Sequence, residues 1–287
     1  MKMYQVDAFS DHLFSGNPAA VIILDEWLDD QLMLNIAQEN NVSETSFAKK
    51  VDQFHYEIKW FSPVKEVQFC GYGTLATSFI IFRNNPDLAE ITFHVAGLGE
   101  FYIQKLQDGF ISMNLPVQIP EPLVEIPELL KEALSQECSE VFINPQAYIV
   151  IYPTVESILN EQPNFEKIKQ LGGRRVAITT RNNLLNSADQ SSGVNAMLSI
   201  NASKGLEFHY DIVSRYFTPS MGVDEDPVTG SLHTSLIPLW CAKLKKDKIT
   251  AYQASKRGGV LHCKLLDYHR VEISGQCKLY MQAEIFI

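Results

Sequence analysis

The sequence lacks the features that mark membrane, secreted and metal-binding proteins. No apolar run among its 287 residues approaches the roughly 18 that a membrane-spanning helix needs. Position 7 is acidic and no continuous apolar segment surrounds it, so we expect no secretory signal and a cytoplasmic protein. The five cysteines form no C-x-x-C pair and have no histidine at zinc-ligand spacing, which predicts reduced thiols and no metal site.

Positive charge and nucleotide-binding motifs are also scarce. The formal net charge is −10, which argues against nucleic acid as a partner because binding a phosphate backbone needs clustered Lys and Arg. The basic stretch KLKKDK at 243–248 is typical of a solvated helix end. The sequence contains neither G-x-G-x-x-G nor a Walker loop, so we expect a protein that works without a cofactor.

What the sequence does contain is a repeated order of motifs. The stretch WFSP at 60–63 is matched by YFTP at 216–219, which begins 156 residues later. The same offset places Cys70 opposite Asp226, and it places GNPAAVII opposite GGRRVAIT. A slightly larger offset aligns GEFYIQKLQDGFISM with GVLHCKLLDYHRVEI. Four features in one order at nearly one spacing predict two structurally related halves.

Each half contains one strongly apolar helix preceded by a polar turn. The first helix is expected to begin at Gly73–Thr74, at the end of CGYGT, and the second at Ser231, at the end of DPVTGS. If the halves pack face to face, both turns reach the shared crevice, where pockets preferentially occur. Helix starts present free amide groups and a positive dipole end, so this crevice is a candidate site for a carboxylate or phosphate.

A proline-rich linker, LPVQIPEPLVEIPE, marks the boundary between the halves. We therefore predict an α+β protein in which residues 1–117 form the first half and 118–277 the second. The final strand, within 278–287, is a candidate to cross back and complete the first half.

Three polar residues near the predicted helix starts each allow two interpretations. Cys70 and Asp226 occupy equivalent places, but a symmetric two-base racemase would need a matched pair, so a small buried residue is the favoured interpretation of Cys70. Asp226, held extended before Pro227, either caps the turn or acts on a ligand. Ser231 either caps the second helix or binds the ligand.

Glu44, in NNVSETSF, is a further candidate for chemistry. A surface charge is one interpretation of a glutamate between a helix and a strand. Its neighbours Val42 and Phe47 favour another, in which apolar surroundings raise the pKa of the carboxyl toward neutrality, as a base that returns its proton requires. These patterns alone do not identify Glu44, rather than Glu39 or Glu57, as the candidate acid/base.

Several motifs together resemble the phenazine-biosynthesis PhzF family over nearly the whole chain. They are VDAFSDHLFSGNPAAVIILDEWL, NVSETSF, WFSPVKEVQFCGYGT, VSRYFTPSMGVDEDPVTGSLH and SKRGGVLHCKL, with GNPAAV, SET and EDPVTGS the most specific. The resemblance implies the diaminopimelate epimerase-like fold, with two pseudo-symmetric halves. Each half has a curved, mostly antiparallel sheet around a central helix, and the active site lies between them. It also implies a homodimer.

PhzF is a cofactor-independent isomerase in which a glutamate moves a proton between carbons of a dihydro-hydroxyanthranilate. The resemblance implies Glu44 as this acid/base and Asp226 as a second catalytic group that holds a substrate hydroxyl or amine. Substrate binding then involves the loops that begin each helix and the GNP loop. The implied substrate-binding residues are Asn17, Gly71, Tyr72, Gly73, Thr229, Gly230 and Ser231. We therefore expect an isomerase acting on a small carboxylated substrate.

One departure bears on the substrate. The family usually reads CGHAT, whereas this chain has Tyr72 in place of the histidine and Gly73 in place of the alanine. Tyrosine can donate a hydrogen bond and stack on a ring, but it is a poor proton shuttle at neutral pH. Two alternatives therefore stay open: a racemase or epimerase that uses Cys70 with Glu44, and a non-catalytic small-molecule binding protein that has kept the fold.

Overall fold

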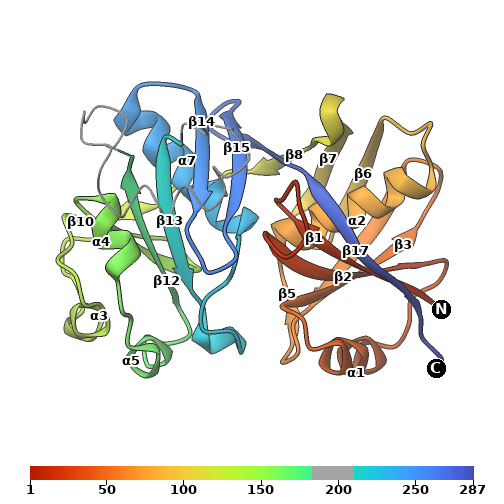
Figure 1. Cartoon of the computed structure of the whole chain (residues 1–287), viewed down its shortest axis with the longest axis horizontal. Helices are drawn as coiled ribbons and strands as arrows, with labels where there is room; N and C mark the ends of the chain where they lie inside the picture. Colours follow the sequence, from red (N-terminus) through yellow and green to blue (C-terminus); the bar gives the residue numbers. More distant parts are fainter. Residues whose placement is uncertain (183–209) are drawn as a thin grey trace.

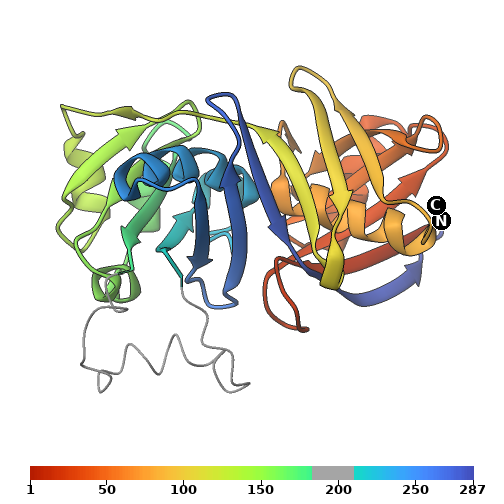
Figure 2. The same ribbon diagram turned by 90° about the horizontal axis from the view of Figure 1, so that it is seen from above.

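The computed structural model describes residues 1–182 and 210–287, which form two lobes lying side by side (Figures 1 and 2). The first lobe contains α1 Asp30–Asn40 and α2 Gly71–Asn84, and its strands are β1 Lys2–Ala8, β2 Asn17–Leu24, β3 Glu44–Lys50, β4 His55–Phe61, β5 Glu66–Val67, β6 Glu90–Val95, β7 Gly99–Lys105 and β8 Ile111–Pro116, with the short turn η1 Gln107–Gly109. The second lobe contains α3 Glu128–Ala133, α4 Val155–Asn160, α5 Phe165–Lys169, α7 Gly230–Leu244 and the turn η4 Pro219–Met221, and its strands are β9 Glu121–Pro122, β10 Glu140–Ile143, β11 Ala147–Ile151, β12 Arg175–Arg181, β13 Ile212–Phe217, β14 Lys248–Gln253, β15 Gly259–Leu265 and β16 Arg270–Gly275. The last strand, β17 Cys277–Glu284, returns to the first lobe and pairs with β1.

Helices α2 and α7 are each buried nearly all round, as their apolar sequences predict. Helix α2 packs against β1, β2, β3, β8 and β17, and α7 packs against β14, β15 and β16. Each lobe is therefore a sheet around one central helix (Figure 1). No helix of the described residues combines the length and the apolar character that a membrane span requires.

The two lobes repeat one order of strand pairing. In the first lobe β1–β2 is antiparallel, β2–β3 parallel, β3–β4 antiparallel, β4–β6 parallel, and β6–β7 and β7–β8 antiparallel. In the second lobe β10–β11 is antiparallel, β11–β12 parallel, β12–β13 antiparallel, β13–β14 parallel, and β14–β15 and β15–β16 antiparallel. The predicted repeat is therefore present in the fold, and the sheets are mostly antiparallel as expected.

The strand register corrects one part of the predicted repeat. Thr45 pairs with Phe61 in the first lobe and Val176 pairs with Phe217 in the second, so β3 is equivalent to β12. The strand of GNPAAVII, β2, is then equivalent to β11 and not to GGRRVAIT. The sequence match was wrong because two adjacent apolar strands have similar composition, and only the pairing distinguishes them. The correction makes Glu44 and Arg175 equivalent residues.

The positions at which the two helices begin correct a second part of the predicted repeat. Helix α2 begins at Gly71 after the cap Cys70, and α7 begins at Gly230 after the cap Thr229. Thr229, rather than Asp226, is therefore the equivalent of Cys70. The loop that precedes α7 is three residues longer than the loop that precedes α2, which a fixed offset cannot represent. Helix α2 also begins two residues before the predicted Gly73, because the Cys70 thiol accepts the N–H of Gly73 at 3.3 Å and caps the helix.

The two helix starts touch through their backbones at Gly71 and Gly230. A Cβ on Gly71 would lie 2.8 Å from the Cα of Gly230, and one on Gly230 would lie 3.0 Å from the Cα of Gly71. Contacts under 3 Å between a Cβ and backbone require the backbone itself to shift. Gly71 therefore requires glycine, a Cβ on Gly230 would be tightly crowded, and the amino ends of α2 and α7 meet at this contact.

The two lobes are joined by strand pairing as well as by the contact between the helix starts. Strand β8 pairs with β16 over six residues, so the sheet of the first lobe continues into the second. Strand β17 pairs with β1 along its length and crosses the first lobe (Figure 1). The division of the chain at residues 117 and 118 stays a prediction.

Arg257 forms a clasp between the lobes beside this junction. Its guanidinium donates to the carbonyl of Gly16 at 2.8 Å, to the carbonyl of Ser15 at 3.0 Å and to Oδ1 of Asp7 at 2.8 Å. The amide of Gly16 in turn donates to the carbonyl of Gly258 at 2.8 Å. The turn that leads into β2 is therefore fixed to the second lobe.

We expect Arg257→Met to lower the free energy of unfolding by about 3 kcal/mol, because it leaves the buried Asp7 carboxylate without its cation. Urea unfolding measures this change. The control is Lys256→Met, which removes an exposed charge from the neighbouring position. Equal stability of the two variants would show that the clasp contributes nothing to the folded state.

Candidate active site

A small pocket lies where the two helix starts meet, and residues of both lobes line it. Its cavity volume is about 40 Å³, enough for a few water molecules and far below the roughly 300–1,000 Å³ of a drug-sized site. The described lining residues that carry polar side chains are Ser43, Glu44, Cys70, Tyr72, Arg175, Tyr216, Thr218, Asp226, Thr229 and Ser231.

Six of the nine predicted site residues line this pocket: Glu44, Gly71, Tyr72, Asp226, Thr229 and Ser231. The other three are not among its lining residues. Asn17 is fully buried and its Nδ2 donates to Oδ1 of Asp226 at 2.7 Å and to the carbonyl of Val228 at 2.9 Å. The Gly73 amide is engaged by the Cys70 thiol, and Gly230 packs on Gly71. Asn17 can therefore act on a ligand only through Asp226.

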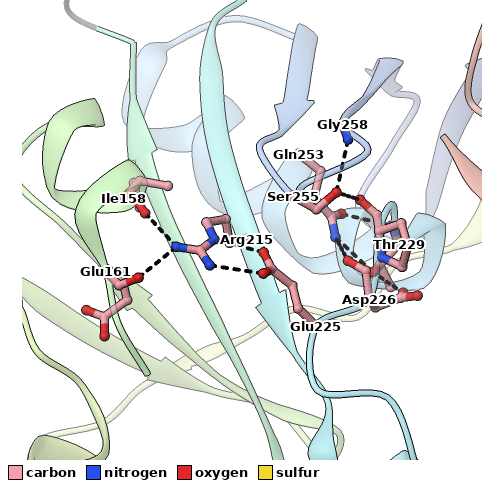
Figure 3. A network of polar contacts seen from close by, with 10 residues as sticks. Ile158, Glu161, Arg215, Glu225, Asp226, Thr229, Gln253, Ser255 and Gly258 are labelled. Carbon is pink, nitrogen blue, oxygen red and sulfur yellow. Dashed lines mark hydrogen bonds and ion pairs between the residues drawn. The ribbon is translucent and has the colours of Figure 1, made fainter. Parts of the chain in front are cut away.

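Asp226 is held in place by a dense set of hydrogen bonds (Figure 3). Its amide donates to the carbonyl of Tyr216 at 2.9 Å, and its carbonyl accepts from Nε2 of Gln253 at 2.8 Å. Its carboxylate accepts from Asn17 and from the Thr229 hydroxyl, and the Thr229 amide donates to Oε1 of Gln253 at 2.8 Å. The carboxylate therefore cannot rotate freely within the pocket.

Glu225, the residue before Asp226, anchors the loop that precedes α7. Glu225 forms two parallel hydrogen bonds with Arg215, at 2.8 and 2.9 Å, and Arg215 also donates to the carbonyls of Ile158 and Glu161 (Figure 3). Paired bonds of this kind between Arg and a carboxylate are strong and directional. The three additional residues of this loop are therefore held rigidly, and they bring Asp226 into the pocket beside Thr229.

Burial sets the protonation of both carboxyls in the pocket. It raises the pKa of Asp226 to about 6, against the lowering effect of hydrogen bonds from Thr229 and Asn17. It also raises the pKa of Glu44 well above its usual range, and the negative charge of Asp226 adds to this. The positive charge of Arg175 opposes the effect on Glu44 without cancelling it. Near neutral pH Asp226 is therefore mostly ionised, while burial makes the protonated form of Glu44 more accessible than it is for an ordinary glutamate.

Cys70 faces the same pocket but is not prepared to be a nucleophile or a base. Burial, together with the neighbouring charge of Glu44, raises the pKa of the thiol well above its usual range. A reactive cysteine needs the opposite, a lowered pKa that favours the thiolate. The thiol serves as the cap of α2 and supplies the Gly73 amide with an acceptor.

Arg175 and Tyr216 line the pocket and were not predicted from the sequence. Burial by itself would lower the pKa of the Arg175 guanidinium, but Tyr216 and the two carboxyls outweigh this and raise it. Burial raises the pKa of the Tyr216 phenol, so this side chain is neutral. The strand equivalence of Glu44 and Arg175 would have revealed Arg175, but the offset of 156 paired GGRRVAIT with the wrong strand.

Comparison with known proteins identifies the family. The sequence profile of the PhzC-PhzF family, described as phenazine biosynthesis-like protein, matches residues 6–283. An uncharacterized isomerase of Pseudomonas aeruginosa is 37% identical over 287 residues, covering 100% of this chain and 99% of that protein. This chain belongs to the PhzC-PhzF family.

The solved structures agree with this assignment. The crystal structure of a PhzF-family phenazine biosynthesis protein from Enterococcus faecalis matches with a TM-score of 0.83 at 31% identity, covering 100% of this chain and 99% of that one. A probable proline racemase from Agrobacterium radiobacter matches with a TM-score of 0.60 at 8% identity, covering 100% of this chain and 93% of that one, which shows a shared fold alone. The predicted family and the epimerase-like α+β fold are confirmed.

Among the described residues, no cluster of three His, Cys, Asp or Glu side chains is arranged to hold a metal ion. The polar groups of the pocket are instead two carboxyls, a guanidinium, hydroxyls and helix-start amides. This PhzC-PhzF pocket can therefore bind an anionic or hydroxylated molecule and transfer a proton to or from it.

The raised pKa of Asp226 predicts how stability depends on pH. A carboxyl that binds a proton more tightly in the folded protein than in the unfolded chain lowers stability as pH rises from its unfolded value toward its folded one. Between about pH 4 and pH 6 we expect the wild type to lose about 3 kcal/mol that Asp226→Asn does not lose. Chemical unfolding across this pH range measures the difference.

The control for this measurement is Asp224→Asn, an exposed aspartate in the same loop. It should follow the wild-type pH profile. If Asp226→Asn also follows that profile, the carboxyl of Asp226 is not perturbed by burial.

Proposed function

We propose that this protein is a PhzF-like isomerase that moves a proton between two carbons of a small carboxylated substrate, with Glu44 as the mobile acid and base. The observation that carries the proposal is the environment of Glu44, a carboxyl at the start of β3 that faces a pocket between two helix starts. Its raised pKa suits a group that must both take and return a proton, since burial makes the protonated form easier to reach. The isomerase names of relatives support the same class of reaction.

The reaction is an internal rearrangement that needs no oxidant or reductant. The Glu44 carboxylate takes a proton from one carbon, and the electron pair of that C–H bond enters a conjugated system of double bonds. The system then accepts the same proton from Glu44 at a second carbon, and the double bonds are relocated. Asp226, mostly ionised near neutral pH and held by Asn17 and Thr229, accepts a hydrogen bond from a substrate hydroxyl or amine.

The substrate carboxylate binds at the paired helix starts. The amide groups of Gly71 and Tyr72 in α2, and of Gly230 and Ser231 in α7, have no acceptor among residues 1–182 and 210–287. The positive ends of both helix dipoles converge at the Gly71–Gly230 contact. Free amide donors and a positive potential favour a carboxylate at this point.

Pocket size and Tyr72 limit the substrate further. A volume of about 40 Å³ requires the pocket to widen before a ring acid can enter, and it favours a small ligand. Tyr72 is buried and lines the pocket, where its ring can stack on a planar substrate and its hydroxyl can donate a hydrogen bond. A cytoplasmic location, a homodimer and independence of cofactors stay predictions.

The Cys70 racemase is the weaker of the enzymatic alternatives. A two-base racemase needs an ionised base on one face of the reacting carbon and a protonated acid on the other, and the two groups exchange roles in the reverse direction, so each must be able to ionise. Burial raises the pKa of Cys70, and the equivalent of Cys70 in the second lobe is Thr229, which is no base. A non-catalytic binding protein would have no need of a glutamate with a raised pKa facing the ligand pocket.

We expect Glu44→Gln to abolish proton exchange while the protein still folds. General acid–base catalysis by one side chain contributes about 10²–10⁴-fold, so the variant should lose at least that factor. The measurement is incorporation of deuterium from D₂O into a panel of small cyclic and conjugated carboxylic acids, followed by mass spectrometry. Glu39→Gln, which removes an exposed carboxylate from α1, is the matched control and should exchange like the wild type. An active Glu44→Gln variant would refute the role of Glu44.

We expect Cys70→Ser to retain most of the exchange activity, because serine can also accept the Gly73 amide and cap α2. The same deuterium assay measures it. Loss of exchange below about a hundredth of wild type, in a variant with wild-type stability, would favour the Cys70 racemase instead.

A further inference from the structure

Arg175 brings a positive charge into the pocket without a carboxylate to neutralise it. It is the first residue of β12, it is half-buried, and it lines the pocket from the second lobe. None of the ion pairs formed within the described part of the chain includes it. A guanidinium that lines a pocket and has no ion-pair partner keeps N–H donors available for an anionic group of a ligand.

The two carboxyls nearest to Arg175 cannot fill this role. Burial raises the pKa of Glu44 and so disfavours the charged carboxylate that an ion pair with Arg175 would need. Asp226 already accepts hydrogen bonds from Asn17 and from the Thr229 hydroxyl, which hold it in place within its own loop. Neither forms an ion pair with Arg175, although both influence its pKa electrostatically.

The neutral contacts of Arg175 are weak. Its Nη1 lies 3.5 Å from Oε1 of Gln146, at the limit of a hydrogen bond, and its Nη2 lies 3.4 Å from the thioether sulfur of Met221. The Tyr216 hydroxyl interacts with it as a neutral phenol. A guanidinium has five N–H donors in a planar fork that matches a carboxylate, and these partners leave that capacity largely unused.

We propose that Arg175 binds a second anionic group of the substrate, and that the substrate class is therefore small dicarboxylates. The inference rests on the proposed function, in which the helix-start amides of Gly71, Tyr72, Gly230 and Ser231 take the first carboxylate. Arg175 is the equivalent of Glu44 in the repeated fold, so the two lobes place a proton-transfer group and an anion-binding group at matching strand starts. Glu44, as the acid and base, then faces a substrate that is held at two points.

Two-point binding also explains how a small pocket can orient its ligand. A monocarboxylate held at the helix starts alone could still turn about its single anchored group. A second contact with a planar, bidentate guanidinium fixes the direction of the carbon chain, and with it the carbons that face Glu44. Arg175 is then a specificity-determining residue that touches the substrate.

The test compares two probes that differ by one charge. Glutarate carries two carboxylates, and its monoamide glutaramate has nearly the same shape with one carboxylate. Isothermal titration calorimetry measures the binding of each to the wild type and to Arg175→Met, Arg175→Lys and Arg181→Met. Arg181→Met is the matched control, since it removes an exposed arginine at the other end of the same strand.

We expect the wild type and Arg181→Met to bind glutarate at least about tenfold more tightly than glutaramate. Arg175→Met should bind the two probes equally, with its affinity for glutaramate unchanged. Arg175→Lys should keep part of the preference, because it retains the charge but loses the fork. Circular dichroism confirms that each variant is folded.

Three outcomes would overturn the proposal. They are equal binding of both probes by the wild type, failure of the wild type to bind glutarate at millimolar concentration, and a preference for glutarate that survives in Arg175→Met. A loss of glutaramate binding in Arg175→Met would place Arg175 at the first carboxylate and would likewise refute a second anion site. Because the readout is binding rather than turnover, the result is independent of the Glu44→Gln exchange experiment.

Discussion

The contact between Gly71 and Gly230 is the constraint on which the rest of the site depends. The backbones of two helix starts approach so closely that a Cβ on either glycine would meet the Cα of the other. This contact brings the positive ends of α2 and α7 together, and the pocket forms beside it. The pairing of β8 with β16 and the Arg257 clasp hold the lobes at the distance that keeps the contact closed.

The chemistry of the pocket follows from burial around that contact. Desolvation raises the pKa of Glu44 and of Asp226, while Arg175 supplies a positive charge that limits both shifts. Asn17 and Thr229 donate hydrogen bonds to Asp226 and keep it closer to the ionised state than Glu44. Two carboxyls in one pocket thus have different surroundings, and such a difference is what the proposed division into an acid–base group and a binding group needs.

The repeated motifs predicted the two-lobed fold because local similarity survives in strands and helices. WFSP and YFTP close equivalent strands, β4 and β13, and the fixed offset is correct there. The offset fails at the helix starts, since three extra residues in the loop before α7 shift Thr229 into the place of Cys70. Those same residues carry Asp226 into the pocket, so the departure from symmetry is where the two lobes acquire different functions.

Local patterns in the chain determined the family, the α+β class, the two buried helices and six of the pocket-lining residues, because turns, caps and apolar periodicity are properties of neighbouring residues. Tertiary structure decided which of these residues face a ligand. It placed Asn17 behind Asp226, made Cys70 a helix cap and brought Arg175 opposite Glu44. The Cys70 cap is a local contact, but the roles of Asn17 and Arg175 depend on desolvation and on residues more than a hundred positions apart, which no local pattern encodes.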